Sequence, residues 1–331
     1  MRARTFEAGH LHRHDGAAGI RDGAPRRVDR GIVGPRQRPA RAIEAGRFVL
    51  LPSFHSEPTR EVLMQSGPGK QADRMTVAYR SRHVEFDLSA RGTALLAGTL
   101  ECGLIIDGAA QAPSGDWQSV CWYADDDCDY LELRCCVSDS VWIDRQMLLS
   151  RRSHLTMIAD AVVARGAATL EYRMSLPVSE GVKVKFDSAT RECRLEAKSR
   201  RARVYPVALP QDRVSGTPGS FQERGGRLEL TQRGARGGLY VPVVLDWHPQ
   251  RRSQGAEWRS LTVTETGKVI SPDRAAGHRL RVGRHQLFIY KSLERPDDAR
   301  AVLGYHTWYD AVVGTIDAAG AVDPIVMVEV E

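Results

Sequence analysis

Two short segments of the chain carry the side chains best suited to chemistry. They are LDWHPQRR at 245–252 and GYHTWYDAVVG at 304–314. A histidine beside a tyrosine can take up and release a proton, and paired arginines can hold a carboxylate or sulfate through parallel hydrogen bonds. We therefore predict acid–base groups next to an acidic sugar. The candidate catalytic residues are His306, Tyr309 and His248, and the candidate substrate-binding residues are Trp308, Tyr305, Trp247, Arg251 and Arg252.

The same two segments also fit a structural role. On a strand over 301–309, His306 and Trp308 share one face, and Tyr305 lies on the other. Aromatic residues on strands most often pack into a core, and polar groups at strand ends are usually hydrogen-bonded. A sugar site further requires that the two segments approach each other in space, so the sequence leaves both interpretations open.

One acidic segment resembles the start of a calcium loop. In ADDDCDY at 124–130, Asp125, Asp127 and Asp129 occupy alternate positions. The sixth position is Tyr130 where an EF-hand needs glycine, and the twelfth is Cys136 where it needs glutamate. An EF-hand is therefore excluded. Two interpretations of the segment stay open: a solvated loop and a calcium site of another kind. We expect no metal and no cofactor.

The charge distribution argues against nucleic acid as a partner. The formal net charge is +6, but residues 1–45 contain ten arginines and five acidic residues. The remainder has 37 basic and 36 acidic residues, and a nearly neutral body lacks the positive field that phosphate binding needs. No apolar run reaches the length of a signal peptide or membrane helix, so we expect a cytoplasmic protein without membrane contact. The six cysteines match no zinc spacing, and we expect free buried thiols.

Period-two alternation of apolar and polar residues dominates the chain beyond its first 46 residues. In ATLEYRMSL at 168–176, for example, Tyr172 falls on the apolar side and Arg173 on the polar side. Such alternation indicates strands with one face in a core and the other in water. Strands are predicted at 47–51, 75–80, 82–88, 99–106, 118–123, 129–135, 140–149, 154–163, 168–176, 182–187, 191–198, 201–209, 227–232, 238–246, 258–265, 285–293, 301–309 and 325–330.

These strands predict an all-β protein, a large antiparallel β-sandwich of the super-sandwich kind. About eighteen strands exceed what a single immunoglobulin-like sandwich uses, so we expect larger stacked sheets. Residues 1–46 lack a sustained apolar period and are predicted to form a disordered basic arm. The β-sandwich domain is assigned to 47–331, with a candidate internal boundary in the Gly/Pro-rich segment 210–226.

Three strand motifs between residues 116 and 178 resemble the β-sheet module of heparinase II/III-like proteins, a polysaccharide-lyase superfamily. They are an Asp-Arg pair (Asp144, Arg145), an Ile-Ala-Asp turn (Ile158, Ala159, Asp160) and a Glu-Tyr-Arg run (Glu171, Tyr172, Arg173). The resemblance covers about 80 residues. The resemblance implies that this segment is a sheet module. In members of the family the module follows a toroid of helices. That toroid supplies a tyrosine that acts as acid and base, and a polar residue, often asparagine, that neutralises the uronate carboxylate. This sequence shows no such helices and contains no asparagine.

Three functional hypotheses follow from these observations. The first is a carbohydrate-associated β-sandwich that binds or helps process an acidic polysaccharide or oligosaccharide without complete catalytic machinery. The second is an active polysaccharide lyase or glycoside hydrolase that uses His306 or His248 with Tyr309. The third is a structural protein whose broad sheets pair with copies of itself as a homo-oligomer.

Overall fold

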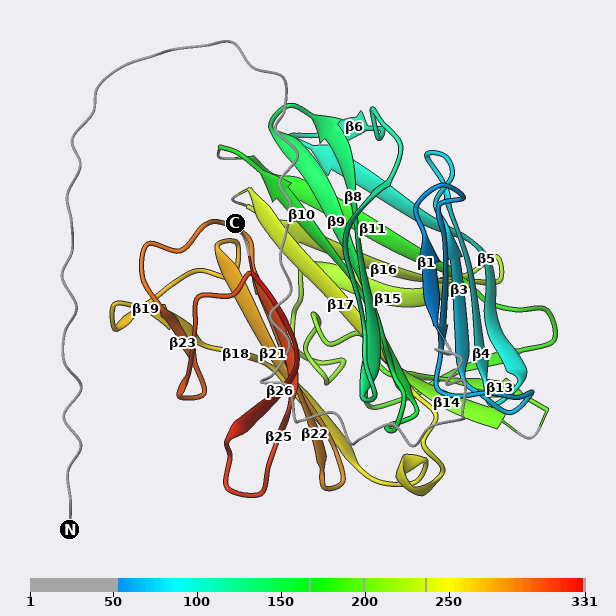
Figure 1. Ribbon diagram of the computed structural model, residues 1–331. Helices are drawn as coiled ribbons and strands as arrows, with labels where there is room; N and C mark the ends of the chain where they lie inside the picture. The colour runs from blue at the N-terminus through cyan, green and yellow to red at the C-terminus, as the bar shows by residue number, and fades with distance from the viewer. Residues whose placement is uncertain (1–52, 167, 199, 236, 330–331) are drawn as a thin grey trace, which may run out of the picture.

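The protein consists almost entirely of antiparallel strands arranged in four sheets. The computed structural model describes residues 53–166, 168–198, 200–235 and 237–329. In Figure 1 the sheets lie as successive layers, from the nine-stranded sheet at the right to the four-stranded sheet at the left. The predicted all-β, antiparallel sandwich is therefore confirmed. The predicted arm at 1–46 and the predicted strand at 47–51 lie outside the described residues. Within those residues, no helix has the length and apolar character needed to cross a membrane.

The first two layers are the largest sheets. The nine-stranded sheet has the order β1-β2-β3-β4-β5-β11-β16-β15, with β6 paired to β5. Its strands are β1 (Phe54–Ser56), β2 (Glu61–Gln65), β3 (Arg74–Ala78), β4 (Val84–Ala90), β5 (Thr93–Ile106), β6 (Ala109–Gln111), β11 (Leu170–Pro177), β15 (Gly219–Arg224) and β16 (Arg227–Gly234). The eight-stranded sheet has the order β12-β13-β14-β17-β10-β9-β8-β7. Its strands are β7 (Gln118–Ala124), β8 (Cys128–Ser138), β9 (Val141–Ser150), β10 (Leu155–Ala164), β12 (Lys183–Phe186), β13 (Cys193–Ala197), β14 (Arg200–Tyr205) and β17 (Gly238–Asp246).

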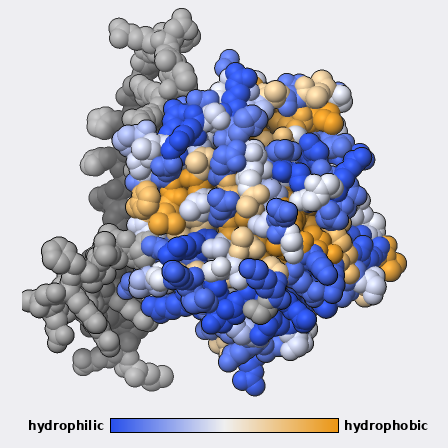
Figure 2. Space-filling model, turned by 90° about the vertical axis from the view of Figure 1, so that its right-hand side faces the viewer, coloured by the Kyte–Doolittle hydropathy of each residue, from blue (hydrophilic) through white to orange (hydrophobic). Residues whose placement is uncertain are grey.

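The largest hydrophobic core fills the space between these two sheets. Phe86 and Tyr172 enter it from the nine-stranded sheet, and Ile143 and Val241 enter it from the eight-stranded sheet. Tyr172 is fully buried and Arg173 is exposed, so the predicted facing of β11 is confirmed. The outer face of the nine-stranded sheet carries exposed polar pairs, and Figure 2 shows mostly hydrophilic residues with apolar groups between them on that side.

The eight-stranded sheet is covered on its second face as well. There it packs against a five-stranded sheet of order β18-β21-β22-β25-β26. Its strands are β18 (Ala256–Leu261), β21 (Ala275–Val282), β22 (His285–Ser292), β25 (Ala311–Ile316) and β26 (Val322–Val328). Every residue of β10 and β17 is consequently buried. The prediction that one strand face meets water is wrong for these two strands, whose near-continuous apolar runs are typical of strands covered on both sides.

A small four-stranded sheet forms the last layer. Its order is β20-β19-β23-β24, and a third hydrophobic cluster joins it to the five-stranded sheet. The bounds are β19 (Val263–Glu265), β20 (Lys268–Val269), β23 (Arg300–Val302) and β24 (Tyr305–Thr307). The strand predicted at 301–309 is thus a hairpin. Leu303 and Gly304 turn it, with φ of 52° and 76°, the left-handed geometry that two-residue hairpin turns require.

Other differences from the predicted strands have similar local causes. The strand predicted at 258–265 is divided between β18 and β19, which belong to different sheets. The segment 210–226, predicted as a loop, contains β15, whose six residues pair with β16. Strands β2, β21 and β25 were absent from the prediction, because short or glycine-containing segments give weak alternation.

A buried polar network connects the first two layers. Arg145 of β9 donates to both carboxylate oxygens of Asp160 on β10, at 2.8 and 3.0 Å. The hydroxyl of Tyr172 on β11 donates to Asp160 Oδ2 at 2.6 Å, and Arg145 also reaches the carbonyl of Leu100. The Arg145 guanidinium lies 4.7 Å from the ring centre of Trp117. Each charge is therefore compensated in the core, and the hydrogen bonds fix the register of one sheet on the other.

The second interface contains an isolated imidazole. His278 of β21 is 5% exposed, and its ring centre lies 6.0 Å from that of Tyr240 on β17. Its Nδ1 lies 3.5 Å from Ser260 Oγ, whereas Nε2 has no partner among the described residues. Burial lowers the pKa of His278 to about 4. The folded protein therefore holds this side chain neutral.

The Arg145–Asp160 pair yields a stability prediction. Asp160→Ala leaves a buried guanidinium without its counter-ion, and breaking a buried pair in this way costs about 3–5 kcal/mol. Arg233→Ala is the matched control, since Arg233 pairs with Glu171 on the surface and exposed pairs contribute about 0–1 kcal/mol. Urea denaturation measures both free energies of unfolding. Equal losses for the two variants would contradict the proposed role of the network.

His278 yields a prediction of pH dependence. Its folded-state pKa lies below the ordinary value of 6.5, so the unfolded chain binds the proton first. The stability that depends on neutral His278 is present above pH 6.5 and is lost as the pH falls toward about 4. His278→Gln removes this contribution and should flatten the decline of the free energy of unfolding over that range. His83→Gln, at an exposed histidine, should leave the decline unchanged. Parallel profiles for wild type and His278→Gln would refute the assignment.

Candidate functional site

Three histidines gather where strands from three sheets begin or end. We call His154, His248 and His285, with the carboxylates of Asp73 and Asp246, the imidazole cluster. Asp73 immediately precedes β3, His154 precedes β10, His248 follows β17, and His285 begins β22. The ring centres of His154 and His248 are 5.6 Å apart. The cluster thus brings together residues separated by more than 200 positions in the chain.

His154 is held by a buried carboxylate. Its Nδ1 lies 2.6 Å from Oδ2 of Asp73, which is fully buried while the histidine side chain is 31% exposed. The other carboxylate oxygen of Asp73 accepts the backbone N–H of Arg91 at 2.8 Å. With Nδ1–H donating to Asp73, neutral His154 presents the lone pair of Nε2 for accepting a proton. This is the geometry of an oriented base.

His248 is fixed differently. Its backbone N–H donates to Asp246 Oδ1 at 2.8 Å, and its Nδ1 accepts the N–H of Gln250 at the start of a 3-10 turn, η1 (Pro249–Arg251). Partial burial lowers the pKa of His248, and the nearby Arg251 guanidinium lowers it further. The pKa of His285 is lowered to about 4, first by burial and then by Arg251. Two of the three imidazoles therefore favour their neutral forms.

Of the sequence-predicted residues in this region, Arg251 is engaged within the protein. It donates to both oxygens of Asp246, at 2.7 and 3.0 Å, and to the carbonyl of Ser153. It is 8% exposed, so it positions the 246–251 turn beside His154. Trp247 is 4% exposed and belongs to the largest core, which leaves no face for stacking on a sugar. Arg252 is exposed, with Nε donating to the Pro249 carbonyl at 3.3 Å.

Two arginines contact the loop that precedes Asp73. Arg74 of β3 donates to the carbonyl of Gly69, and Arg200 of β14 donates to the side chain of Gln71. The backbone N–H of Arg91 donates to Asp73 itself. These contacts hold the loop and the carboxylate that orients His154.

The second sequence-predicted segment lies two layers away. Figure 1 shows β23, to which β24 is paired, on the far side of the five-stranded sheet from β17. Tyr305 packs edge-on against Phe288 at 6.0 Å and donates to the sulfur of Met327 at 3.5 Å. The backbone N–H of Tyr309 donates to Thr307 Oγ1. Tyr305 thus contacts the third core and Asp310 pairs with Lys291 of β22, whereas His248 and Arg251 of the first segment lie at the imidazole cluster.

Two side chains of this second segment remain on the surface. His306 is exposed on the outer face of β24, and Trp308 is 58% exposed just beyond the end of that strand. The prediction that His306 and Trp308 share a strand face is wrong, because β24 ends at Thr307. Trp308 nevertheless offers an open indole face, which can stack on a sugar ring.

The three candidate calcium ligands do not converge. Asp125 accepts the N–H groups of Asp127 and Cys128 and the hydroxyl of Tyr123. Asp127 pairs with Arg152 on the surface, while Asp129 is buried and pairs with Arg151. No group of three or more His, Cys, Asp or Glu side chains in the described part of the chain is placed to hold a metal ion.

Sequence reasoning missed Asp73 and His154. Asp73 follows a glycine-rich turn and His154 lies in SRRSH at 150–154, and neither segment carries a recognisable motif. The two residues are 81 positions apart and precede strands of different sheets, β3 and β10, so only the packing of one sheet on the other brings them together. A polar residue immediately before a strand was the one available signal, and many surface residues share it.

Comparison with known proteins identifies the fold. No family model and no curated protein matches the chain. Among solved structures, heparan sulfate lyase HepC from Pedobacter heparinus is similar over 75% of this chain and 44% of its own, with a TM-score of 0.54 and 12% identity. A heparinase III matches the same shares with a TM-score of 0.50 and 10% identity. A second heparinase III gives 0.51 and 8%, over 75% of this chain and 43% of its own.

These similarities establish a fold resemblance to the heparinases, as the strand motifs predicted. This chain spans less than half the length of the lyases that it matches. At identities of 8–12%, the likeness concerns the arrangement of the sheets.

The His154–Asp73 contact yields a spectroscopic prediction. Neutral His154 should exist as the Nδ1–H tautomer, because that proton is hydrogen-bonded to the Asp73 carboxylate. Long-range proton–nitrogen NMR distinguishes the two ring nitrogens. In Asp73→Asn the acceptor loses its charge, and the Nε2–H tautomer should gain population. A wild-type spectrum dominated by the Nε2–H tautomer of His154 would contradict the described geometry.

Proposed function

We propose that this protein binds an acidic polysaccharide at the imidazole cluster and lacks a complete set of catalytic groups. The observation that carries the proposal is the pair of part-exposed imidazoles, His154 and His248, with ring centres 5.6 Å apart. His154 and His248 are each close in the sequence to an exposed arginine, Arg152 and Arg252 respectively, on a fold similar to that of a heparan sulfate lyase. Guanidinium groups, the Nε2–H of neutral His248 and, when His154 is protonated, the Nε2–H of His154 can donate hydrogen bonds to the carboxylates and sulfates of such a polymer.

The geometry supports binding more strongly than turnover. Acid–base cleavage needs a base, a proton donor for the leaving oxygen and a group that neutralises the substrate carboxylate. His154 suits the first role, but Arg251 is committed to Asp246. The candidates His306 and Tyr309 lie on another layer, beside the third core. A partner chain or domain would supply the missing groups.

An active lyase is the second candidate, favoured by the His154–Asp73 hydrogen bond. A carboxylate that is hydrogen-bonded to Nδ1 orients the ring and leaves Nε2 available for proton transfer, as a general base requires. In this alternative His154 removes the proton next to the uronate carboxylate, a carbon–carbon double bond forms as the adjacent carbon–oxygen glycosidic bond breaks, and the leaving oxygen takes up a proton from water. A neutral His248 donates a hydrogen bond to the same sugar through Nε2–H.

Trp308 is proposed as a separate contact for sugar rings. Its indole is exposed, and its distance from the imidazole cluster across two layers suits a long polymer better than a disaccharide. Stacking on an aromatic face depends little on the charge of the sugar. The two contacts should therefore differ in their preference for acidic polymers.

Calorimetric titration with heparan sulfate oligosaccharides and with a neutral maltohexaose tests the proposal. Wild type should bind the acidic ligand more tightly, and His154→Gln should weaken that binding about tenfold through the loss of one charge-assisted contact. His83→Gln is the control at an exposed histidine outside the cluster. Trp308→Ala should weaken binding of both ligands equally.

The same samples separate the two candidate functions. A lyase creates a carbon–carbon double bond in the uronate, which ultraviolet absorbance detects during incubation. Binding without new absorbance supports the first candidate, and absorbance that His154→Gln abolishes supports the second. Unchanged affinity in His154→Gln, or tighter binding of maltohexaose, would refute acidic-polymer binding at the cluster.

A further inference from the structure

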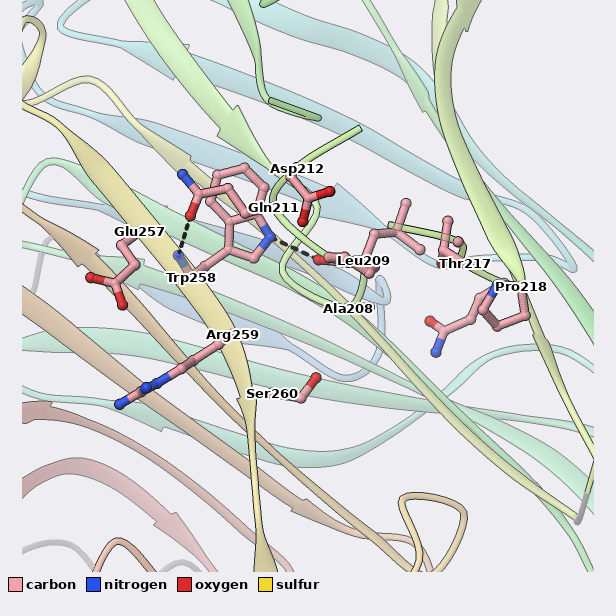
Figure 3. Close-up of a pocket in the computed structure, with 13 residues that line it drawn as sticks. Ala208, Leu209, Gln211, Asp212, Thr217, Pro218, Glu257, Trp258, Arg259 and Ser260 are labelled. Atoms are coloured by element: carbon pink, nitrogen blue, oxygen red, sulfur yellow. Dashed lines mark hydrogen bonds between the residues drawn. The ribbon is translucent and has the colours of Figure 1, made fainter. Parts of the chain in front are cut away.

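A groove of about 590 Å³ lies between the edges of two sheets. One wall is β18, the terminal strand of the five-stranded sheet, and the other contains Gln232 of β16 and Thr217 and Pro218 just before β15. Residues 208–212 form the floor. Figure 3 shows Gln211 over Trp258 at one side, with Thr217 and Pro218 at the other. This volume falls within the range of about 300–1,000 Å³ that is usual for ligand sites.

The side chain of Gln211 imitates a neighbouring strand on part of the β18 edge. Its Nε2 donates to the carbonyl of Ala256 at 2.8 Å, and its Oε1 accepts the N–H of Trp258 at 3.4 Å. These are the contacts that the backbone of an added strand would make. The loop is anchored beside them, because the Trp258 indole donates to the Leu209 carbonyl at 2.8 Å.

Ser260, two residues beyond Trp258 on the same strand edge, faces the groove. Backbone groups of a strand alternate between its two sides, so Ser260 directs its N–H and C=O the same way as Ala256 and Trp258. The intervening residues Glu257 and Arg259 direct theirs toward β21, with which β18 is paired. An uncovered strand edge is a template for pairing with another extended chain.

A buried acceptor faces the same groove from the opposite wall. Gln232 Oε1 is buried and has no hydrogen-bond partner among the described residues. A buried polar atom left unpaired destabilises the protein, and a ligand N–H that donates to it removes that cost. The two acids of the lining are already engaged: Glu257 pairs with Arg281, and Asp212 accepts the N–H groups of Val214 and Ser215. The side chain of Arg259 extends away from Thr217 and Pro218 in Figure 3. The groove therefore favours a ligand rich in amides and without charge.

The aromatic residue of the groove disfavours a sugar. Trp258 is 3% exposed and lies edge-on to Tyr205, with ring centres 5.7 Å apart. Its face is thus not available for stacking on a sugar ring. The remaining apolar lining consists of Leu209, Pro210 and Pro218, against which short aliphatic side chains can pack.

We propose that this groove binds an extended, uncharged peptide segment, which adds a short strand to the β18 edge beyond Gln211. The segment pairs with the N–H and C=O of Ser260, and one of its amides donates to Gln232 Oε1. Main-chain hydrogen bonds of this kind supply affinity in β-strand addition, and flanking pockets supply selectivity. The inference is independent of the polysaccharide proposal.

The probe is a pool of acetylated and amidated hexapeptides randomised over uncharged residues, with retained peptides identified by mass spectrometry. The best retained peptide should slow hydrogen exchange at the Ser260 amide, while the Arg259 amide, already paired with β21, should be unchanged. Ser260→Pro deletes the outward N–H without touching the pairing to β21 and should weaken binding at least about fivefold. Ser260→Ala keeps the N–H and should bind like wild type.

Two further measurements, one with a second variant and one with a modified peptide, make the test decisive. Gln232→Leu should weaken binding without altering the edge strand, which covers the case in which Ser260→Pro fails to fold. The same peptide with N-methylated amides cannot donate and should not bind. The proposal is overturned if no peptide is retained, if the N-methylated peptide binds equally well, or if maltohexaose protects the Ser260 amide in place of the peptide.

Discussion

The buried pairing of Arg145 with Asp160 is the interaction on which the rest of the architecture depends. Arg145 and Asp160 face each other across β9 and β10, at the centre of the eight-stranded sheet. Tyr172 reaches the same carboxylate from the nine-stranded sheet. Both charges are fully buried, so each needs its partner in a fixed geometry. Only one register of the two sheets satisfies this requirement, and apolar packing alone would tolerate sliding by two residues.

The four-layer arrangement explains why the candidate chemistry lies at strand ends. The middle strands β10 and β17 are covered on both faces and offer no surface for a ligand. Polar side chains with access to solvent are found just before β10 begins, at His154, and just after β17 ends, at His248. Rigid doubly covered strands hold these ends in place, which suits a site that must keep two imidazoles at a fixed spacing.

Much of the fold, but little of the candidate site, could be predicted from the sequence. Alternation in β11 predicts the facing of Tyr172 and Arg173, because one face of that strand meets a core and the other meets water. The three motifs that resemble the heparinase sheets contribute Arg145, Asp160 and Tyr172, which meet in one network. The burial of β17 on both faces depends on tertiary packing, and the hairpin at Leu303 depends on a two-residue turn. The alternation of apolar and polar residues predicts neither feature. His154 and Asp73 are 81 positions apart and meet only because two different sheets pack together, so local pattern could not reveal them.

A crystal structure with a bound heparan sulfate octasaccharide tests the central claim most directly. The account predicts a carboxylate or sulfate within hydrogen-bonding distance of the ring nitrogens of His154 and His248, with Arg251 still paired to Asp246. An oligosaccharide bound at another surface, with the imidazole cluster in contact only with solvent, would contradict it.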